Sequence, residues 1–334
     1  REKAHRYKGK LFEIVVHSVK GFTHARRLRS DCNESMTITT QSYEAILEQY
    51  SAAMAWMKGL GIRLSPGRTT HYARVIQHWT SAYRTATEAE GRQIFPDFVS
   101  SMFEVFDFVR IHKAFSSVPA AQLTSITQKL QAAVNGPIDA ADETPDSTAA
   151  RNFLFEVTVA AKAHRPERGV TAILDAGSDT GIRLNDKKLW IECKRVTTVQ
   201  KIESNARRAS SQLERVLASE LGSGHRGIVA LDISKILSRG DKIFIARDDR
   251  QLRASVDHMM DQFIQDHSHI WQRVYQRRQR KVIGTIVRFS FMATSENRNM
   301  LVHASQWAMN PRLGVAPGDE EIQRQIVVTL GAEF

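Results

Sequence analysis

Apolar residues recur at helical spacing through the first 135 residues of the chain. From Thr40 onward, four segments carry large apolar side chains three and four positions apart, which places them on one face of an α-helix. Ser65-Pro66 begins the second segment in the manner of a helix start. The pattern predicts a mainly helical N-terminal domain over residues 1–135, with helices near residues 43–57, 72–83, 99–109 and 123–134.

A shorter apolar run from Leu11 to Val19 lies upstream of these helices, among basic residues. This run is compatible with a strand that carries a basic arm, and equally with a solvated terminus. The helical domain as a whole is expected to supply either recognition or partner contacts, the latter in a homo-oligomer or with another protein.

The hydrophobic pattern changes after residue 135. Residues 136–148 contain two prolines, four acidic residues and little that can pack, so they predict a linker. An apolar helix is then expected at residues 151–164, with Glu156 as its only acidic residue. We expect residues 149–334 to form an α/β domain, with strands at 170–174, 227–233 and 282–293, helices at 202–217 and 252–274, and either state at 300–309 and 322–330.

Two short runs of alternating apolar residues flank a polar turn between Asp179 and Arg195. This alternation predicts a β-hairpin. On the second strand, the two-residue period places Trp190, Glu192 and Lys194 on one face. A carboxylate and an ammonium group are therefore expected side by side on this strand.

The register of the hairpin decides which residue faces this pair. A turn centred between residues 186 and 187 would pair Leu184 with Leu189 and would place Asp179 opposite Lys194. A slip of one residue would send Asp179 to the other face. A longer hairpin would bring Asp175 to the site in its place.

Two carboxylates at cross-strand separation can bind one hard divalent cation and leave a lysine beside it. The carboxylate of Glu156 raises a separate question, because an ionised carboxylate buried without a partner costs several kcal/mol. We expect Glu156 either to face a cation or to lie at an exposed edge of its helix.

Composition adds information about partners. The chain has 334 residues, with 47 Lys and Arg against 36 Asp and Glu, which gives a net charge of +11. This excess favours a polyanionic partner, and nucleic acid more than a membrane, because no basic amphipathic helix stands out. The two cysteines have no disulfide or metal-ligand spacing, and no apolar run is long enough for a signal or a membrane span. The sequence predicts a cytoplasmic protein without a membrane partner.

The order of these elements resembles the PD-(D/E)XK phosphodiesterase superfamily, whose fold is restriction endonuclease-like. The resemblance consists of a helix with one acid, a strand, a hairpin with Asp179 followed by Glu192-x-Lys194, a helix and a further strand, over about residues 147–233. Ser178 stands where the family name has proline. The resemblance implies a mixed sheet flanked by helices and a Mg²⁺-dependent nuclease that hydrolyses phosphodiester bonds, most of all in DNA, with Mn²⁺ as a substitute ion.

The resemblance also implies roles for single residues. Asp179 and Glu192, with the backbone carbonyl of Cys193, would bind Mg²⁺, and Lys194 would orient the attacking water. Glu156 would act through a water or a second metal ion. Gln212, on the helix that follows, would help to position the strand and would contact nucleic acid. Arg208 on the same helix and Arg195 at the end of the hairpin would contact phosphates.

Other chemistries find less support in the sequence. No Gly-x-x-x-x-Gly-Lys-Ser/Thr loop occurs, which argues against a phosphate-loop ATPase, and the histidines are too scattered for a zinc site. Two alternatives stay open. One is a catalytically inactive nucleic-acid-binding module of the same fold, and the other is a helical partner-binding protein in which Glu192 and Lys194 are exposed and remote from Asp179.

Overall fold

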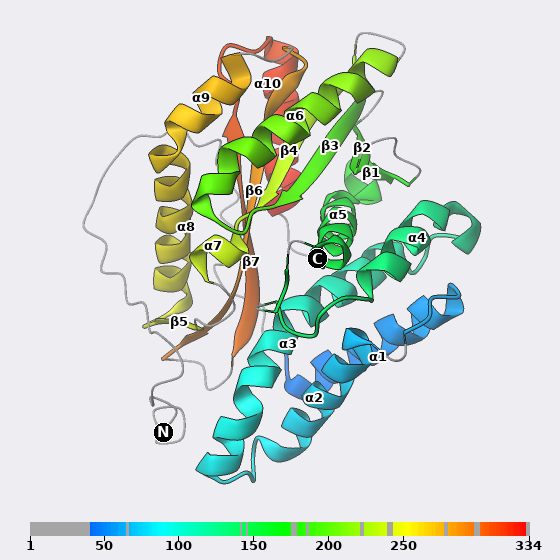
Figure 1. Cartoon of the computed structure of the whole chain (residues 1–334), viewed down its shortest axis with the longest axis vertical. Coiled ribbons are helices and arrows are strands. Elements are labelled where there is room, and N and C mark those ends of the chain that lie inside the picture. Colours follow the sequence, from blue (N-terminus) through cyan, green and yellow to red (C-terminus); the bar gives the residue numbers. More distant parts are fainter. Residues whose placement is uncertain are drawn as a thin grey trace.

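The computed structural model contains a mixed β-sheet with helices on both faces and a helical region at one end (Figure 1). The predicted α/β class and the helical character of the N-terminal part are therefore confirmed. The apolar run from Leu11 to Val19 and the rival acid Asp175 lie outside the described residues. The structure describes residues 41–64, 67–140, 142–144, 146–174, 179–184, 187–220, 224–238, 243–276, 280–296 and 301–331.

The helical region is built from the predicted apolar stripes, and local capping residues fix where its helices begin. The hydroxyl of Ser42 accepts a hydrogen bond from the backbone N–H of Ala45 at 3.1 Å at the start of the first helix. Thr87 and Glu90 form a reciprocal capping box at the start of the third. The elements are α1 (Tyr43–Gly59), α2 (Arg68–Ala82), α3 (Glu88–Phe115), η1 (Ala120–Gln122) and α4 (Thr124–Ala133).

The sheet has seven strands among the described residues, in the order β1-β2-β3-β4-β6-β5, with β7 paired to β6. Strands β1 to β3 form an antiparallel meander, whereas β4 lies parallel to β3 and needs a crossover connection, which a helix supplies. The long strand β6 pairs with β4 and β5 in parallel and with β7 antiparallel. The strands are β1 (Val170–Ile173), β2 (Thr180–Leu184), β3 (Lys187–Arg195), β4 (Arg226–Asp232), β5 (Ile243–Ala246), β6 (Val282–Ser295) and β7 (Val302–Pro311).

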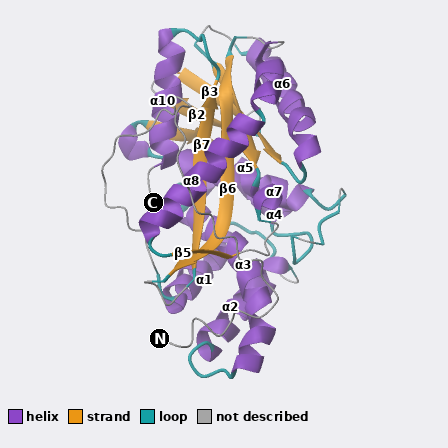
Figure 2. Ribbon diagram, turned by 90° about the vertical axis from the view of Figure 1, so that its left-hand side faces the viewer, coloured by secondary structure: helices purple, strands orange, loops and turns teal. Residues whose placement is uncertain are grey.

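The alternation of side chains along β3 decides which helices cover each face of the sheet. Trp190 packs in one core with α6 (Ile202–Ser219), α8 (Asp249–Asp266) and α9 (Ser268–Gln276). The alternate residues of β3, whose side chains lie on the opposite face, pack in another core with α5 (Ala149–Ala163) and α10 (Pro317–Gly331); they are Leu189, Ile191 and Cys193. Figure 2 shows α6 and α10 on opposite sides of the strands. Shorter helical turns lie at η2 (Pro166–Arg168), η3 (Val199–Lys201) and α7 (Ser234–Leu237).

The register of the hairpin differs from the prediction by two residues. Leu184 pairs with Lys187 rather than with Leu189, so two residues separate the paired strand ends. Two residues is the shortest common connection of a β-hairpin, and it tightens the pairing relative to the four-residue turn that we expected. Because a shift of two residues preserves the side-chain alternation, the predicted faces of β3 are unchanged.

One predicted element is wrong as well. The long helix expected over residues 252–274 is two helices, α8 and α9, which meet at His267. A ring nitrogen of His267 lies 2.7 Å from the carbonyl oxygen of Phe263, where it competes with the backbone for this acceptor. The change of direction allows Trp271 and its neighbours in α9 to pack into the core that contains α6. Strand β5 was not predicted, whereas residues 302–311 and 317–331 prove to be a strand and a helix.

A single apolar core joins the helical region to the α/β part. The cluster around Tyr50 and Phe108 also contains Leu154 and Val157 of α5. Two buried ion-pair networks cross the same boundary. In the first network, Glu104 of α3 lies 2.6 Å from Nε of Arg151 of α5 and 2.5 Å from Arg68 of α2. In the second, Arg288 of β6 lies 2.7 Å from Asp107 of α3 and 3.3 Å from Asp232 of β4. The helical region and α5 are therefore fixed to each other.

Candidate functional site

Asp179 lies directly before β2, and its carboxylate reaches across to β3. The Oδ2 atom accepts a hydrogen bond from the backbone N–H of Cys193 at 2.8 Å and another from Nζ of Lys194 at 2.9 Å. Continuing the register one residue beyond the Thr180–Ile191 pair places Asp179 opposite Glu192. Asp179 was expected opposite Lys194, and the two-residue shift moves it to Glu192 while keeping it beside both side chains.

Glu192 and Lys194 are both largely buried. The side chain of Glu192 is only 3% exposed, and its Oε2 atom lies 3.4 Å from Nζ of Lys194. Burial lowers the pKa of Lys194, but the neighbouring carboxylates of Asp179 and Glu192 outweigh burial and raise this pKa above its ordinary value. Lys194 therefore stays protonated at neutral pH, and one ammonium group is shared by two carboxylates.

Glu156 of α5 joins the same cluster through a lysine that the sequence analysis did not single out. Nζ of Lys129, on α4, lies 2.7 Å from Oε2 of Glu156. The same ammonium group donates a short hydrogen bond to the backbone carbonyl of Asp179. Of the two options left open for Glu156, the structure realises the one in which the carboxylate faces a cation.

The three carboxylates are held together against their mutual repulsion. Burial is the main factor that raises the pKa of Glu192 to about 7, and the charge of Asp179 adds to it. The pKa of Glu156 is also raised to about 7 by burial and by Asp179, in spite of Lys129. With all groups ionised, three carboxylates face two ammonium groups, so a further cation would relieve the excess negative charge.

The oxygen atoms at this site suit a hard divalent cation. Asp179 and Glu192 offer carboxylates, and the N–H of Cys193 points to Asp179, so the carbonyl of the same residue points to the same edge of β3. The Cys193 thiol lies on the opposite face, where burial raises its pKa well above the ordinary value. Two carboxylates with a carbonyl and water form an adequate set for Mg²⁺. Across the described ranges, no three His, Cys, Asp or Glu side chains form a group that could hold a metal ion.

The three residues expected to bind nucleic acid differ in their surroundings. Nη1 of Arg195 lies 2.6 Å from Oε1 of Glu143, whose side chain is fully buried in the predicted linker. Arg208 is exposed on α6 and has no ion-pair partner in the part of the chain that the structure describes. The Oε1 atom of Gln212 is buried without a hydrogen-bond partner among the described residues. Arg208 is therefore available to a ligand, whereas Arg195 is already paired.

Lys129 and Glu143 contact the predicted site residues Glu156 and Arg195, and the sequence pattern predicted neither contact. Lys129 lies on a helix of the N-terminal region, 27 residues before Glu156, and no motif connects the two positions. The one available signal was the charge balance, since three acids at one site need more than Lys194 as a counter-ion. Glu143 stood among four acids of a predicted linker, and nothing in the sequence separated it from them.

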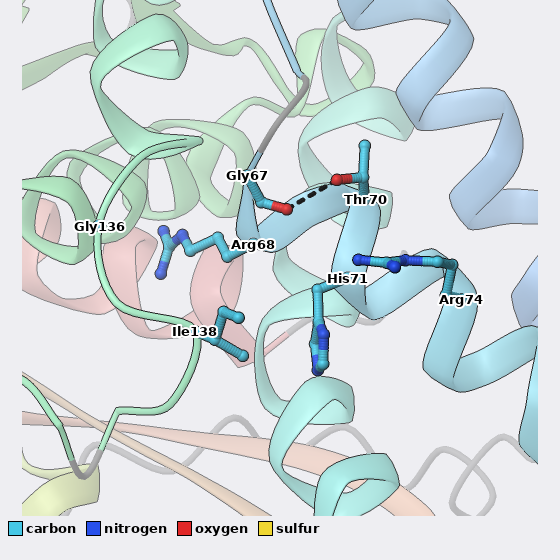
Figure 3. Close-up of a pocket in the computed structure, with 7 residues that line it drawn as sticks. All are labelled: Gly67, Arg68, Thr70, His71, Arg74, Gly136 and Ile138. Atoms are coloured by element: carbon cyan, nitrogen blue, oxygen red, sulfur yellow. Dashed lines mark hydrogen bonds between the residues drawn. The ribbon is translucent and has the colours of Figure 1, made fainter.

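A separate cavity of about 550 Å³ lies in the helical region, at the start of α2. Figure 3 shows His71 and Arg74 beside it, with Arg68 deeper in the protein. The guanidinium of Arg68 is engaged with Glu104 at 2.5 Å. None of the residues that line this cavity belongs to the cluster of Asp179, so the cavity and the carboxylate site are distinct places.

Comparison of the chain with protein-family models, with curated proteins and with solved structures yields no significant match. In the described part of the chain, no helix combines the length and the apolar character needed to cross a membrane.

Proposed function

We propose that this protein is a Mg²⁺-dependent nuclease that hydrolyses phosphodiester bonds in DNA. The observation that carries the proposal is the position of the Lys194 ammonium, 2.9 Å from Asp179 and 3.4 Å from Glu192. Carboxylates from two neighbouring strands and a protonated lysine thus converge on one point. This set supplies ligands for a hard cation and a positive group for a phosphate.

The fold supports the same proposal at a coarser level. The elements α5, β1, β2, β3, α6 and β4 follow one another in the order that the resemblance to the PD-(D/E)XK superfamily implies, and β4 pairs in parallel with β3. We propose on this basis that the mixed sheet is restriction endonuclease-like. The alternative in which Glu192 and Lys194 are exposed and remote from Asp179 does not agree with the burial of Glu192 and with the contact of Lys194 to Asp179.

Each residue of the carboxylate-lysine site has a role in this proposal. A bound Mg²⁺ would polarise the scissile phosphate and lower the pKa of a bound water. Asp179 and Glu192, with the Cys193 carbonyl, would hold the ion. Because Lys194 stays protonated, it would donate hydrogen bonds that orient the water and the phosphate rather than remove a proton. Glu156 would stabilise the arrangement through Lys129.

The net charge of +11 supports a nucleic acid as the substrate. Arg208 and Arg215 lie exposed on α6, the helix that covers the Trp190 face of β3. Contacts from such residues would follow the phosphate backbone and would carry little sequence information. A homo-oligomer or a protein partner that uses the helical region, and a cytoplasmic location, remain predictions from the sequence.

A direct assay tests the proposal. The purified protein is incubated with duplex, single-stranded and branched DNA and with RNA, in Mg²⁺, in Mn²⁺ and in excess chelator. We expect cleavage of DNA that requires the divalent ion and is lost in Asp179→Asn. A matched control is Lys188→Met, which removes a lysine of the same strand that pairs with Glu220 at 3.0 Å outside the site.

One observation favours a second function. The ammonium groups of Lys129 and Lys194 already contact all three carboxylates, as they would in a module that binds nucleic acid without cleaving it. In that case the protein would bind DNA with equal affinity in Mg²⁺ and in chelator, and every substrate in the assay would stay intact. Binding and cleavage measured on the same preparation separate the two functions.

A further inference from the structure

We propose that the Lys129 ammonium takes the position of a second cation between Glu156 and Asp179, so that the site holds a single divalent ion. This inference rests on the proposed function and concerns the number of ions that the site accepts. It makes Lys129, which belongs to the helical region, a positioning residue of the site. It also assigns Glu156 to that lysine and not to a metal ion.

The geometry shows how Lys129 is placed. Its Nζ atom lies 2.7 Å from Oε2 of Glu156 and donates to the backbone carbonyl of Asp179. Its side chain is 19% exposed, so the ammonium group is largely withdrawn from water. Helix α4, which carries Lys129, packs directly against α5, which carries Glu156. Two packed helices thus bring a fixed positive charge to the start of β2.

The carboxylates of the site divide between the two lysines. Lys194 contacts the carboxylates of Asp179 and Glu192, whereas Lys129 contacts the carboxylate of Glu156 and only the main chain of Asp179. A divalent ion beside Glu156 would need this carboxylate and the Asp179 carbonyl as ligands, and both are already bound by Lys129. A second divalent ion at this place would also stand next to a buried ammonium group, which electrostatic repulsion disfavours.

The contact has a consequence for the geometry of the first ion. By holding the carbonyl of Asp179, Lys129 fixes the backbone from which the Asp179 carboxylate projects toward Cys193. A ligand whose backbone is fixed loses less conformational entropy when it binds an ion. Lys129 therefore prepares Asp179 for metal binding without being a ligand.

The test counts bound ions in the full chain, without nucleic acid. Free Mn²⁺ is measured by electron paramagnetic resonance during titration of wild type, Asp179→Asn, Lys129→Met, Lys129→Arg, Glu156→Gln and the double variant Lys129→Met/Glu156→Gln. We expect one Mn²⁺ per chain in wild type and in Lys129→Arg. Glu156→Gln should keep this stoichiometry with a Kd within about twofold of wild type. Lys129→Met keeps the aliphatic part of the side chain but frees two oxygen groups, so it should bind a second Mn²⁺, which the double variant should lose.

Several results would overturn the inference. They are two Mn²⁺ ions in wild type, a loss of affinity of about tenfold or more in Glu156→Gln, or Lys129→Met without a second ion. Circular dichroism and thermal unfolding verify that each variant is folded; if Lys129→Met is not folded, Glu156→Gln decides. If wild type binds no Mn²⁺, or binds it independently of Asp179, the proposed function fails. If binding depends on Asp179 but the count is two, only the present inference fails.

Discussion

The ammonium group of Lys194 lies 2.9 Å from Oδ2 of Asp179, a residue that enters the site from the neighbouring strand. This contact links the charge of β3 to the start of β2. Asp179 also accepts a hydrogen bond from the backbone N–H of Cys193, and Lys194 also contacts the carboxylate of Glu192. The position of each of these side chains therefore depends on the others.

Neutral isosteres at the cluster should abolish cleavage and spare binding. We expect Asp179→Asn, Glu192→Gln and Lys194→Met each to lower the cleavage rate by about a hundredfold or more, because each removes a charge that the reaction uses. The affinity for DNA in chelator should change by less than about threefold, since phosphate contacts elsewhere dominate it. Single-turnover cleavage and fluorescence anisotropy measure the two quantities. Full activity in all three variants would refute the site, and Lys188→Met should behave like wild type.

Stability should fall as the pH rises through the range set by the buried glutamates. The pKa values of Glu156 and Glu192 are raised from 4.5 to about 7, so the folded state retains protons that the unfolded state releases between these values. Without divalent ions, the free energy of unfolding should decrease from about pH 4.5 to about pH 7, by up to on the order of 3 kcal/mol per glutamate. Urea unfolding at several pH values measures the slope.

The variant Glu192→Gln should flatten this pH dependence, because glutamine carries no titrating proton. Glu220→Gln is the matched control, since Glu220 pairs with Lys188 at 3.0 Å outside the cluster. Mg²⁺ should restore stability most strongly above about pH 7, where the carboxylates are ionised and bind the ion. An equal slope in Glu192→Gln and wild type would show that this carboxyl group does not titrate in the range.

Among the contacts between the helical region and the sheet, the buried ion pair of Arg288 and Asp107 should contribute most to the free energy of unfolding. Nη2 of Arg288 lies 2.7 Å and 2.8 Å from the two oxygens of Asp107, and the Arg288 side chain is 3% exposed. Asp107→Ala leaves this charge with Asp232 alone, so we expect a loss of about 3 to 5 kcal/mol in urea unfolding. On an exposed pair of the same helix, Glu88→Ala should cost less than about 1 kcal/mol.

Two arginines near the site should affect nucleic-acid binding differently. Arg208 is exposed, so Arg208→Ala should weaken DNA binding and lower the slope of log K against log salt by about one contact. Arg195 is paired with Glu143 at 2.6 Å, so Arg195→Ala should have a smaller effect. Glu143→Gln should release Arg195 and tighten binding. Equal effects of the two arginine variants, measured by anisotropy at several salt concentrations, would contradict this assignment.

The secondary structure around the site and the chemical character of its residues follow from the sequence alone. The two-residue period of β3 placed Glu192 and Lys194 on one face. The observed register differs from the predicted register by two residues, and this shift leaves the two side chains on the same face because it preserves the alternation. The apolar stripes of the helices were equally local, since helical spacing is set by the backbone.

The electrostatic partners of the site residues depend on how distant segments of the chain pack together. Lys129 reaches Glu156 because α4 packs on α5, and Glu143 reaches Arg195 because the segment before α5 lies beside the end of β3. Neither contact follows from periodicity or from a motif, since each depends on the relative placement of segments far apart in the chain. The hairpin that contains Asp179 and Lys194 could therefore be predicted from the sequence. The positions of the charged side chains around it depend on tertiary packing.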